Sequence, residues 1–304
     1  MLTRDKDGTA RAFLNVCRHR GARLVSEDEG CKHRFTCPNH AWTFGSDGAL
    51  VGGPHMESGF PDIDKAQSGL APLPTHESMG LIWVVPKTGM ACDIEAYLEP
   101  MRADFAALDL ASHVIVAQDT IEIAANWKIL VEGGIEAYHF KIAHRDTIAP
   151  FFEDNLSSYT VFAPHMRSIL PRATMAKLDR ATRDAWRVRD HANILYTFFP
   201  TTQFLVQQDH VVMITSRPLA ADRTALRIAT LAPLANADDA EHWQRNHAIT
   251  RTTLDEDFAL GEGIQTGLAS GANSHLTLGR FEGALTKFNA MVDAYLQEDQ
   301  GHAS

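Results

Sequence analysis

The sequence lacks long apolar runs. Its most apolar stretch, residues 80–85, is far shorter than the ~18 residues that a membrane-spanning helix needs, so we predict a buried strand there. Residues 1–6 carry charges of both signs and no apolar segment, which is not the pattern of a secretory signal. We therefore expect a cytoplasmic location and no membrane partner.

Basic residues are also scarce. The chain has 28 Lys and Arg against 38 Asp and Glu, which gives a formal net charge of −10. Proteins that bind a phosphate backbone need a surplus of Lys and Arg. We therefore exclude nucleic acid as a partner.

Cysteine is scarce too, with four residues: Cys17, Cys31, Cys37 and Cys92. A chain of 304 residues, 45% of them hydrophobic, can bury a core without disulfides. In a reducing compartment, cysteines that are grouped with histidines indicate a metal site.

The pattern of apolar and turn-forming residues changes near residue 89. Residues 1–88 are short runs broken by Gly, Pro, Asn and Asp, which predicts a small all-β domain. Residues 89–304 mix helical and strand periodicity, so we predict a second domain and an α+β fold overall. The expected helices are 95–110, 126–144, 241–264 and 280–296; the expected strands are 114–116, 121–123, a hairpin over 194–215, and 225–231.

The first candidate metal site consists of two mixed pairs, Cys17 with His19 and Cys37 with His40. Zinc sites of two Cys and two His usually pair like with like. In a Rieske [2Fe–2S] cluster two Cys hold one iron and two His hold the other, and this arrangement fits the mixed pairs better. Zinc, or four unrelated residues, are the alternatives. Between the pairs we expect Cys31 to be a small buried side chain and His33 a surface residue.

The second candidate site begins with His139 and His144. Five residues advance an ideal helix by about 500°, so the two side chains cannot share one face, and we predict a π-type turn or a helix break between them. A distant carboxylate would complete a 2-His-1-carboxylate iron site with positions open for O₂ and substrate. We favour Asp257 for this ligand, with Asp255 as the alternative. Ordinary core histidines and a solvated acidic helix face are the competing explanations.

Glu136 precedes His139 by about one helical turn. A carboxylate there can accept a hydrogen bond from a ligand imidazole, fix its tautomer and couple it to a second redox centre. The alternative is a charge favoured by the helix dipole. Glu132, one turn earlier, is a weaker candidate for the same role.

Both sites together resemble the α (large) subunits of Rieske non-haem iron, ring-hydroxylating oxygenases. The matching segments are 15–22, 37–42, 126–144, and Glu256-Asp257 followed by Glu262, Gln265 and Gly267-Leu268. The resemblance implies a helix-grip catalytic domain, one [2Fe–2S] cluster and one mononuclear Fe(II). It also implies catalytic roles for Glu136 and Asn126, with Glu136 bridging to the cluster of a neighbouring subunit.

The resemblance further implies an activity and partners. Such subunits form homotrimers or α3β3 assemblies and use O₂ to hydroxylate, dihydroxylate or demethylate a small organic substrate, which we expect to be aromatic. A Glu at the bridging position also occurs in relatives that oxidise quaternary amines. No GxGxxG motif follows a strand, so NAD(P)H electrons are expected from a separate reductase, possibly through a ferredoxin. A Rieske-type electron carrier and a degenerate helix-grip ligand-binding protein are the rival functions.

Two features depart from the family pattern. Residues 2–8 read as a mid-domain strand, so we expect either a misassigned start or a Rieske domain that lacks its first strands and has an exposed sheet edge. Gly133 stands where many relatives have Asn, and each glycine weakens a helix by about 1 kcal/mol. Aromatic and apolar residues are the candidates for a substrate pocket: Phe140, Phe151, Phe152, Tyr159, Phe162, Leu195, Phe198 and Phe204.

Overall fold

A computed structural model describes residues 1–301, which divide into two compact units, Met1–Ala111 and the part from Ser112 onward. The boundary that we expected after residue 88 lies inside the first unit. Helix α2 (Ile94–Ala106) belongs to this unit because it packs against β7 (Thr75–Ser78). None of the described helices is long and apolar enough to cross a membrane.

The first unit contains small antiparallel sheets. One has the order β1-β2-β6, with β1 at its edge, another the order β3-β4-β5, and a third pairs β7 with β8. Its core surrounds the buried side chains of Cys17, Cys37, Trp42 and Phe44. The elements besides α2 and β7 are β1 (Leu2–Arg4), β2 (Ala10–Phe13), β3 (Arg34–Thr36), β4 (Thr43–Gly45), β5 (Leu50–Gly52), α1 (Met56–Gly59), β6 (Pro72–Leu73) and β8 (Leu81–Val84).

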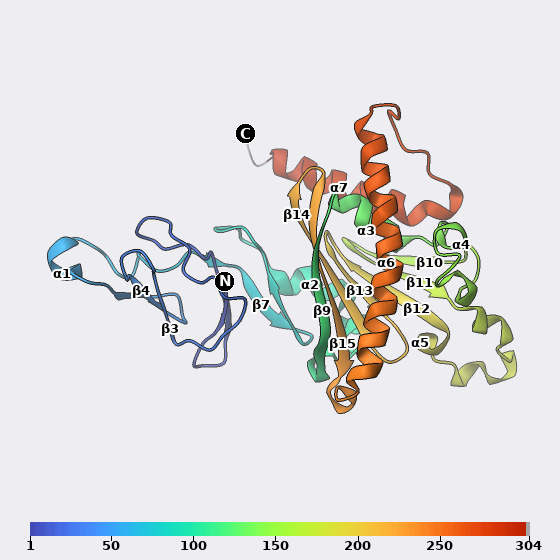
Figure 1. The fold of residues 1–304 in the computed structure, drawn as a ribbon, viewed down its shortest axis with the longest axis horizontal. Helices are drawn as coiled ribbons and strands as arrows, with labels where there is room; N and C mark the ends of the chain where they lie inside the picture. Colours follow the sequence, from blue (N-terminus) through green and yellow to red (C-terminus); the bar gives the residue numbers. More distant parts are fainter. Residues whose placement is uncertain (302–304) are drawn as a thin grey trace. The chain divides into compact units, whose positions relative to one another are not determined.

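The second unit is built on a seven-stranded antiparallel sheet in the order β10-β11-β12-β13-β14-β15-β9 (Figure 1). Residues 114–116 and 121–123 belong to one strand, because β9 pairs with β15 along its length. Residues 194–215 contain parts of three strands, because turns at 199–201 and 207–210 both reverse the chain. The strands are β9 (His113–Ile123), β10 (Ser158–Phe162), β11 (His165–Pro171), β12 (Ala192–Phe198), β13 (Thr202–Val206), β14 (Val211–Ala220) and β15 (Arg223–Pro233).

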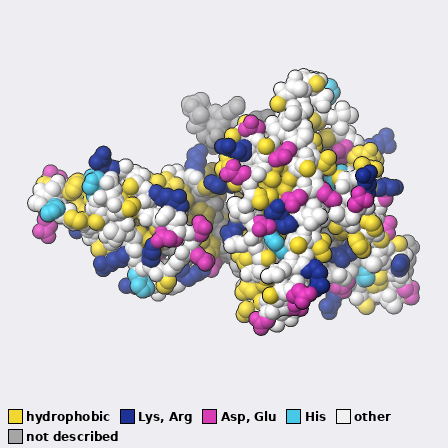
Figure 2. Space-filling model, viewed as in Figure 1, with side chains coloured by type: hydrophobic (Ala, Val, Ile, Leu, Met, Phe, Trp, Pro, Cys, Tyr) yellow, Lys and Arg dark blue, Asp and Glu magenta, His cyan; other side chains and the backbone are white. Residues whose placement is uncertain are grey.

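Helix α6 (Ala240–Ala269) lies along the sheet and contacts β9, β15 and α3 (Trp127–Ile135) (Figure 1). Asp239 caps its first turn, since its carboxylate accepts a hydrogen bond from the His242 N–H. Phe258 anchors the helix in an apolar cluster with sheet residues such as Leu226. Basic and acidic side chains are interspersed on the face of this unit seen in Figure 2. The remaining helical segments are α4 (Phe140–Ala143), α5 (Val188–His191), α7 (Gly283–Gly301), η1 (Leu110–Ser112), η2 (Ala149–Phe151), η3 (Ala173–Lys177), η4 (Arg180–Ala185), η5 (Leu234–Asn236) and η6 (Arg280–Glu282).

The helix predicted over 126–144 is interrupted before His139, and not between His139 and His144 as we predicted. Helix α3 ends at Ile135, Glu136 is extended (φ −118°, ψ 165°), and α4 is one turn long. The paired glycines at the end of α3 favour this break, because glycine weakens a helix. Gly134 also allows close packing, since a Cβ there would lie 3.1 Å from the Gln203 side chain, whereas Gly133 has open space around it.

Candidate metal centres

The two Cys–His loops of the first unit, 17–22 and 37–42, share one backbone geometry. In each loop the cysteine N–H donates a hydrogen bond to the carbonyl five residues later, which is Ala22 or Trp42 (2.8 Å in both). The N–H four residues after the cysteine, of Gly21 or Ala41, donates to the cysteine carbonyl (2.9 and 3.0 Å). That fourth residue has a positive φ in both loops: Gly21 at 79° and Ala41 at 54°. The repeated turn brings the imidazoles of His19, two residues after Cys17, and His40, three residues after Cys37, next to each other.

The cysteine and histidine side chains meet as two pairs. Cys17 and Cys37 are buried, and their thiols are hydrogen-bonded to each other. The rings of His19 and His40 lie with centroids 4.8 Å apart. Backbone N–H groups of the residues two and three positions after each cysteine point at its sulfur. Burial raises the pKa of Cys17; burial opposes ionisation of Cys37 as well, but these N–H groups lower its pKa.

This donor set fits a two-iron cluster better than one zinc ion. Two thiols lie together, two imidazoles lie together, and amide groups point at the sulfurs, as a Rieske cluster requires. These four side chains do not form a group compact enough to bind a single metal ion. Among the described residues, the one such group is His139, His144 and Asp257, in the second unit. Trp42 and Phe60 pack on the ring of His19 at centroid distances of 4.9 and 5.5 Å.

The residues between the two loops do not join this group. Our expectation of a buried Cys31 is wrong: the side chain is exposed, because residues 26–33 form a solvent-facing loop. His33 is exposed, as expected. Phe60 was missed from the sequence, where nothing distinguished it from other aromatic residues.

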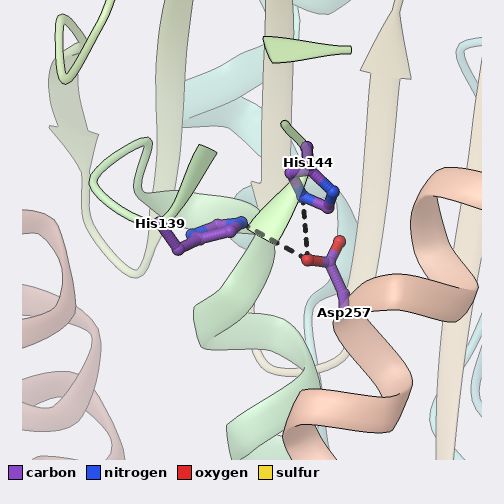
Figure 3. Close-up of side chains that lie close together, drawn as sticks. All are labelled: His139, His144 and Asp257. Carbon is purple, nitrogen blue, oxygen red and sulfur yellow. Dashed lines mark ion pairs between the residues drawn. The ribbon is translucent and has the colours of Figure 1, made fainter. Parts of the chain in front are cut away.

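In the second unit, His139, His144 and Asp257 converge, with all their ligand atoms within 4.8 Å of one another (Figure 3). Asp257 Oδ1 lies 3.0 Å from His144 Nε2 and 3.3 Å from His139 Nε2. The two histidines flank the single turn of α4, one at each end. The predicted break therefore precedes His139 rather than lying between the histidines, and no π-type turn is present in α4.

Asp255, the alternative carboxylate, does not reach this group. Its Oδ1 lies 2.7 Å from Arg251 Nη2, on the exposed side of α6. Asp257 lies two positions onward, which turns it by about 200° to the opposite side of the helix. Of the two aspartates, only Asp257 is a geometrically possible third ligand.

Each histidine is held by a second carboxylate at its other nitrogen. His139 Nδ1 contacts Glu136 Oε1, and the same carboxylate accepts a hydrogen bond from the Tyr138 N–H. His144 Nδ1 lies 2.6 Å from Glu256 Oε2, which also accepts a hydrogen bond from Thr147 Oγ1 at 2.7 Å. The role of Glu256 was missed; its place beside the candidate ligand Asp257 was the available signal.

Two other candidates lie apart from the triad. Asn126 caps α3 through its Oδ1, which accepts from Lys128 N at 3.0 Å, and its Nδ2 donates to Ala221 O at 2.6 Å. No described contact brings it to the two histidines. Glu132 accepts a hydrogen bond from Asn289 at 2.8 Å, and burial raises its pKa. The structure gives both side chains contacts that position α3.

Electrostatics make this group a strong metal candidate. Burial by itself lowers the pKa of His139, but Asp257 and Glu136 outweigh it and raise the pKa to about 9. The pKa of His144 is also raised, against burial, by Asp257 and then Glu256. Burial opposes ionisation of Asp257, yet the two histidines lower its pKa. The Nε2 atom of His139 is buried without a well-formed hydrogen bond, and a metal ion supplies the partner that it lacks.

A cavity of about 90 Å³ lies against His144 and Asp257. Its wall is mainly apolar and includes Phe140, Phe152 and Leu195. Phe151 lines a second cavity, while Phe198 and Phe204 are buried in the core. Tyr159 and Phe162, also expected at a pocket, line neither cavity because they lie on the edge strand β10.

Comparison with known sequence families gives two matches. Residues 110–298 match the family described as ring hydroxylating alpha subunit (catalytic domain). Residues 1–76 match the Rieske [2Fe-2S] domain. Both candidate metal centres lie inside these segments.

Among curated proteins, the carnitine monooxygenase oxygenase subunit of Acinetobacter pittii is 36% identical over 165 residues, which cover 51% of this chain and 41% of that protein. The glycine betaine monooxygenase oxygenase subunit of Pseudomonas aeruginosa is 31% identical over 196 residues, which cover 61% and 41%. Among solved structures, a quaternary ammonium Rieske monooxygenase with a bound inhibitor has a TM-score of 0.79 and 25% identity, covering 97% of this chain and 80% of the other. The chain thus spans less than half the length of the two curated relatives.

Proposed function

This chain belongs to the ring hydroxylating alpha subunit family and carries a Rieske [2Fe–2S] domain, and from that premise we propose that it is the oxygenase component of a multi-protein oxygenase. When bound, the cluster supplies one-electron transfer and the mononuclear Fe(II) supplies O₂ activation. The observation that carries the proposal is the convergence of His139, His144 and Asp257 beside a cavity.

The residues of the first unit would hold the cluster. Cys17 and Cys37 are placed to bind one iron through their thiolates, and His19 and His40 to bind the other through their imidazoles. The backbone N–H groups that point at the sulfurs stabilise negative charge there, which raises the tendency of the site to accept an electron.

The residues of the second unit would hold the mononuclear iron. Two imidazoles and one carboxylate would supply three ligands to the iron, and the cavity against His144 and Asp257 would leave room for substrate beside it. Glu136 and Glu256 accept hydrogen bonds from the Nδ1 atoms, so both rings present Nε2 to the metal. We assign Glu136 the further task of facing a neighbouring subunit's cluster in a homotrimer or α3β3 assembly.

The substrate is a small organic molecule. The curated relatives include oxygenases named for glycine betaine, carnitine and naphthalene, so an aromatic substrate is one option among several. The apolar cavity wall favours an uncharged, apolar part of the substrate next to the iron. A separate reductase is the proposed source of electrons.

The test is to purify the protein anaerobically with iron and sulfide. We expect about three irons per chain, a Rieske signal in the electron paramagnetic resonance (EPR) spectrum after reduction, and O₂ uptake when a reductase is added. About one iron per chain, or no reduced Rieske signal, would contradict the proposal. His139→Ala separates an oxygenase from an electron carrier: an oxygenase loses O₂ uptake but keeps the Rieske signal, and the matched control His33→Ala keeps both.

A further inference from the structure

The cavity beside the candidate iron ligands adjoins a larger one of about 420 Å³. Six residues line both cavities: Ile148, Phe152, Asn193, Leu205, Thr253 and Leu254. A molecule whose one end occupies the inner cavity, near His144 and Asp257, can therefore reach the wall of the outer cavity with its other end.

The charges on these walls are unequal. Asp257, the candidate iron ligand, is the one acidic side chain among the residues that line the two cavities. The outer cavity is lined by two cations, Arg172 and Lys177. Lys177 is exposed to solvent, whereas Arg172 is half-buried. A charge at Arg172 is therefore less screened by water than one at Lys177.

Arg172 is held in place by neutral groups. Its Nε and Nη2 donate to Asn193 Oδ1 at 3.1 and 2.7 Å, and its Nη1 donates to Gln208 Oε1 at 3.2 Å. Its guanidinium also lies 6.0 Å from the centre of the Phe152 ring. No ion pair joins it to a carboxylate among the residues that the structure describes; Asp209, which pairs with His210 and His242, acts on it only through its charge. Burial lowers the pKa of Arg172, yet a guanidinium keeps its charge in a protein.

These contacts leave Arg172 ready for one more partner. A guanidinium has five N–H donors, and three are used, so one remains on each terminal nitrogen. Two donors on the terminal nitrogens match the two oxygens of a carboxylate, and the positive charge of the guanidinium matches its negative charge. A phosphate group, with a charge near −2, would need both Arg172 and Lys177, and the charge of the exposed Lys177 is screened by water.

From this arrangement we propose that the substrate is an organic carboxylate, and that Arg172 binds its carboxylate group while its uncharged part occupies the inner cavity. The inference rests on the proposed function, because it names the substrate class of the same site. Arg172 then determines which compounds bind and which of their carbon atoms lies nearest the iron.

The experiment measures binding by calorimetry to the iron-loaded protein. The probes are benzoate and 3-phenylpropionate, each compared with the primary amide of the same shape. We expect at least one acid to bind about 10-fold or more tighter than its amide, and Arg172→Gln to weaken that acid by about 10- to 100-fold with little effect on the amide. The matched control Lys177→Gln removes an equal charge from the same cavity and should change the affinity less than 3-fold.

Three results overturn the proposal: no acid binds better than its amide, Arg172→Gln weakens acid and amide equally, or Lys177→Gln weakens the acid as much as Arg172→Gln does. Iron content and the reduced Rieske signal are measured on the same preparations. A protein that holds its iron and cluster but shows no preference for acids refutes this inference alone. A protein that holds neither refutes the proposed function instead.

Discussion

Glu256 and Asp257 are consecutive residues of α6, yet their carboxylates hold opposite nitrogens of one imidazole. Glu256 Oε2 lies 2.6 Å from His144 Nδ1, and Asp257 Oδ1 lies 3.0 Å from His144 Nε2. Neighbouring helix positions point about 100° apart, so the ring lies between them. The first carboxylate orients the ring and the second shares the proposed metal with it.

Glu256→Gln should weaken iron binding at the triad without removing a ligand. The amide still accepts a hydrogen bond but no longer carries the charge that makes His144 a better ligand, and such changes typically cost 10- to 100-fold in metal affinity. The measurement is a Co(II) titration followed by visible absorption. The control is Glu241→Gln at the exposed start of α6, which should leave the affinity unchanged. Equal Co(II) affinities of Glu256→Gln and the unmodified protein would contradict the prediction.

The pair Asp257→Asn and Asp255→Asn tests the third ligand. Asp257→Asn should reduce the iron content from about three to about two per chain and abolish O₂ uptake, because an amide oxygen is a poor ligand for iron(II). Asp255→Asn breaks only the ion pair with Arg251 and should keep both. A Rieske signal of normal intensity in both variants shows that the fold is intact. Retained iron in Asp257→Asn would contradict the assignment.

Cys37→Ser and Cys31→Ser test the cluster loops. Cys37 is buried against Cys17, whereas Cys31 is exposed between the loops. We expect Cys37→Ser to lose the reduced Rieske EPR signal and about two irons per chain, and Cys31→Ser to keep them. A normal Rieske signal from Cys37→Ser would refute the placement of the cluster.

Metal binding at the triad should release protons. The pKa of His139 is raised to about 9, so its imidazole is protonated at pH 7.5 in the metal-free protein, and a metal binds only the neutral ring. Binding of Co(II) at pH 7.5 should therefore release the proton of His139, measured by calorimetry in buffers of different ionisation enthalpy. His139→Gln, as a comparison, should release fewer protons. No difference between buffers would show that the ring of His139 is already neutral.

The same pKa predicts how the stability of the metal-free protein depends on pH. A group whose pKa rises on folding stabilises the fold fully below its unfolded value, here 6.5, and loses that contribution as the pH rises through about 9. The melting temperature of the metal-free protein should therefore fall between pH 7 and pH 10 by more than that of the metal-bound protein. Thermal unfolding followed by circular dichroism measures this, and parallel curves for the two forms would contradict it.

The sequence predicted those parts of the fold that depend on short-range patterns. The small β domain, the α+β catalytic unit and the long helix α6 followed from turn residues and periodicity. The family relationship followed from the Cys–His pairs and from the segment around His139. Asp257 was favoured over Asp255 because of resemblance, since periodicity alone gives no reason to choose between two exposed-looking acids.

What the sequence could not predict depends on contacts between distant segments. The paired glycines before Glu136 weaken the helix locally, but the close packing of Gly134 on Gln203 joins distant segments and is not visible in the sequence. Asn126 was a catalytic candidate by resemblance, and the structure adds that it caps α3 and contacts Ala221, which lies 95 residues away. The roles of Glu256 and Arg172 each require a partner at least 20 residues away, so neither was visible before the chain was folded.

The two proposed metal centres differ in how much of the chain each needs, and this sets an order for their assembly during synthesis. All four cluster residues lie within residues 17–40, in a domain matched over 1–76. The residues of that site are therefore all made before those of the second unit. The triad joins α4 to α6, and its carboxylate is residue 257. The triad can therefore bind mononuclear iron only after residue 257 has been made, well after the cluster site exists.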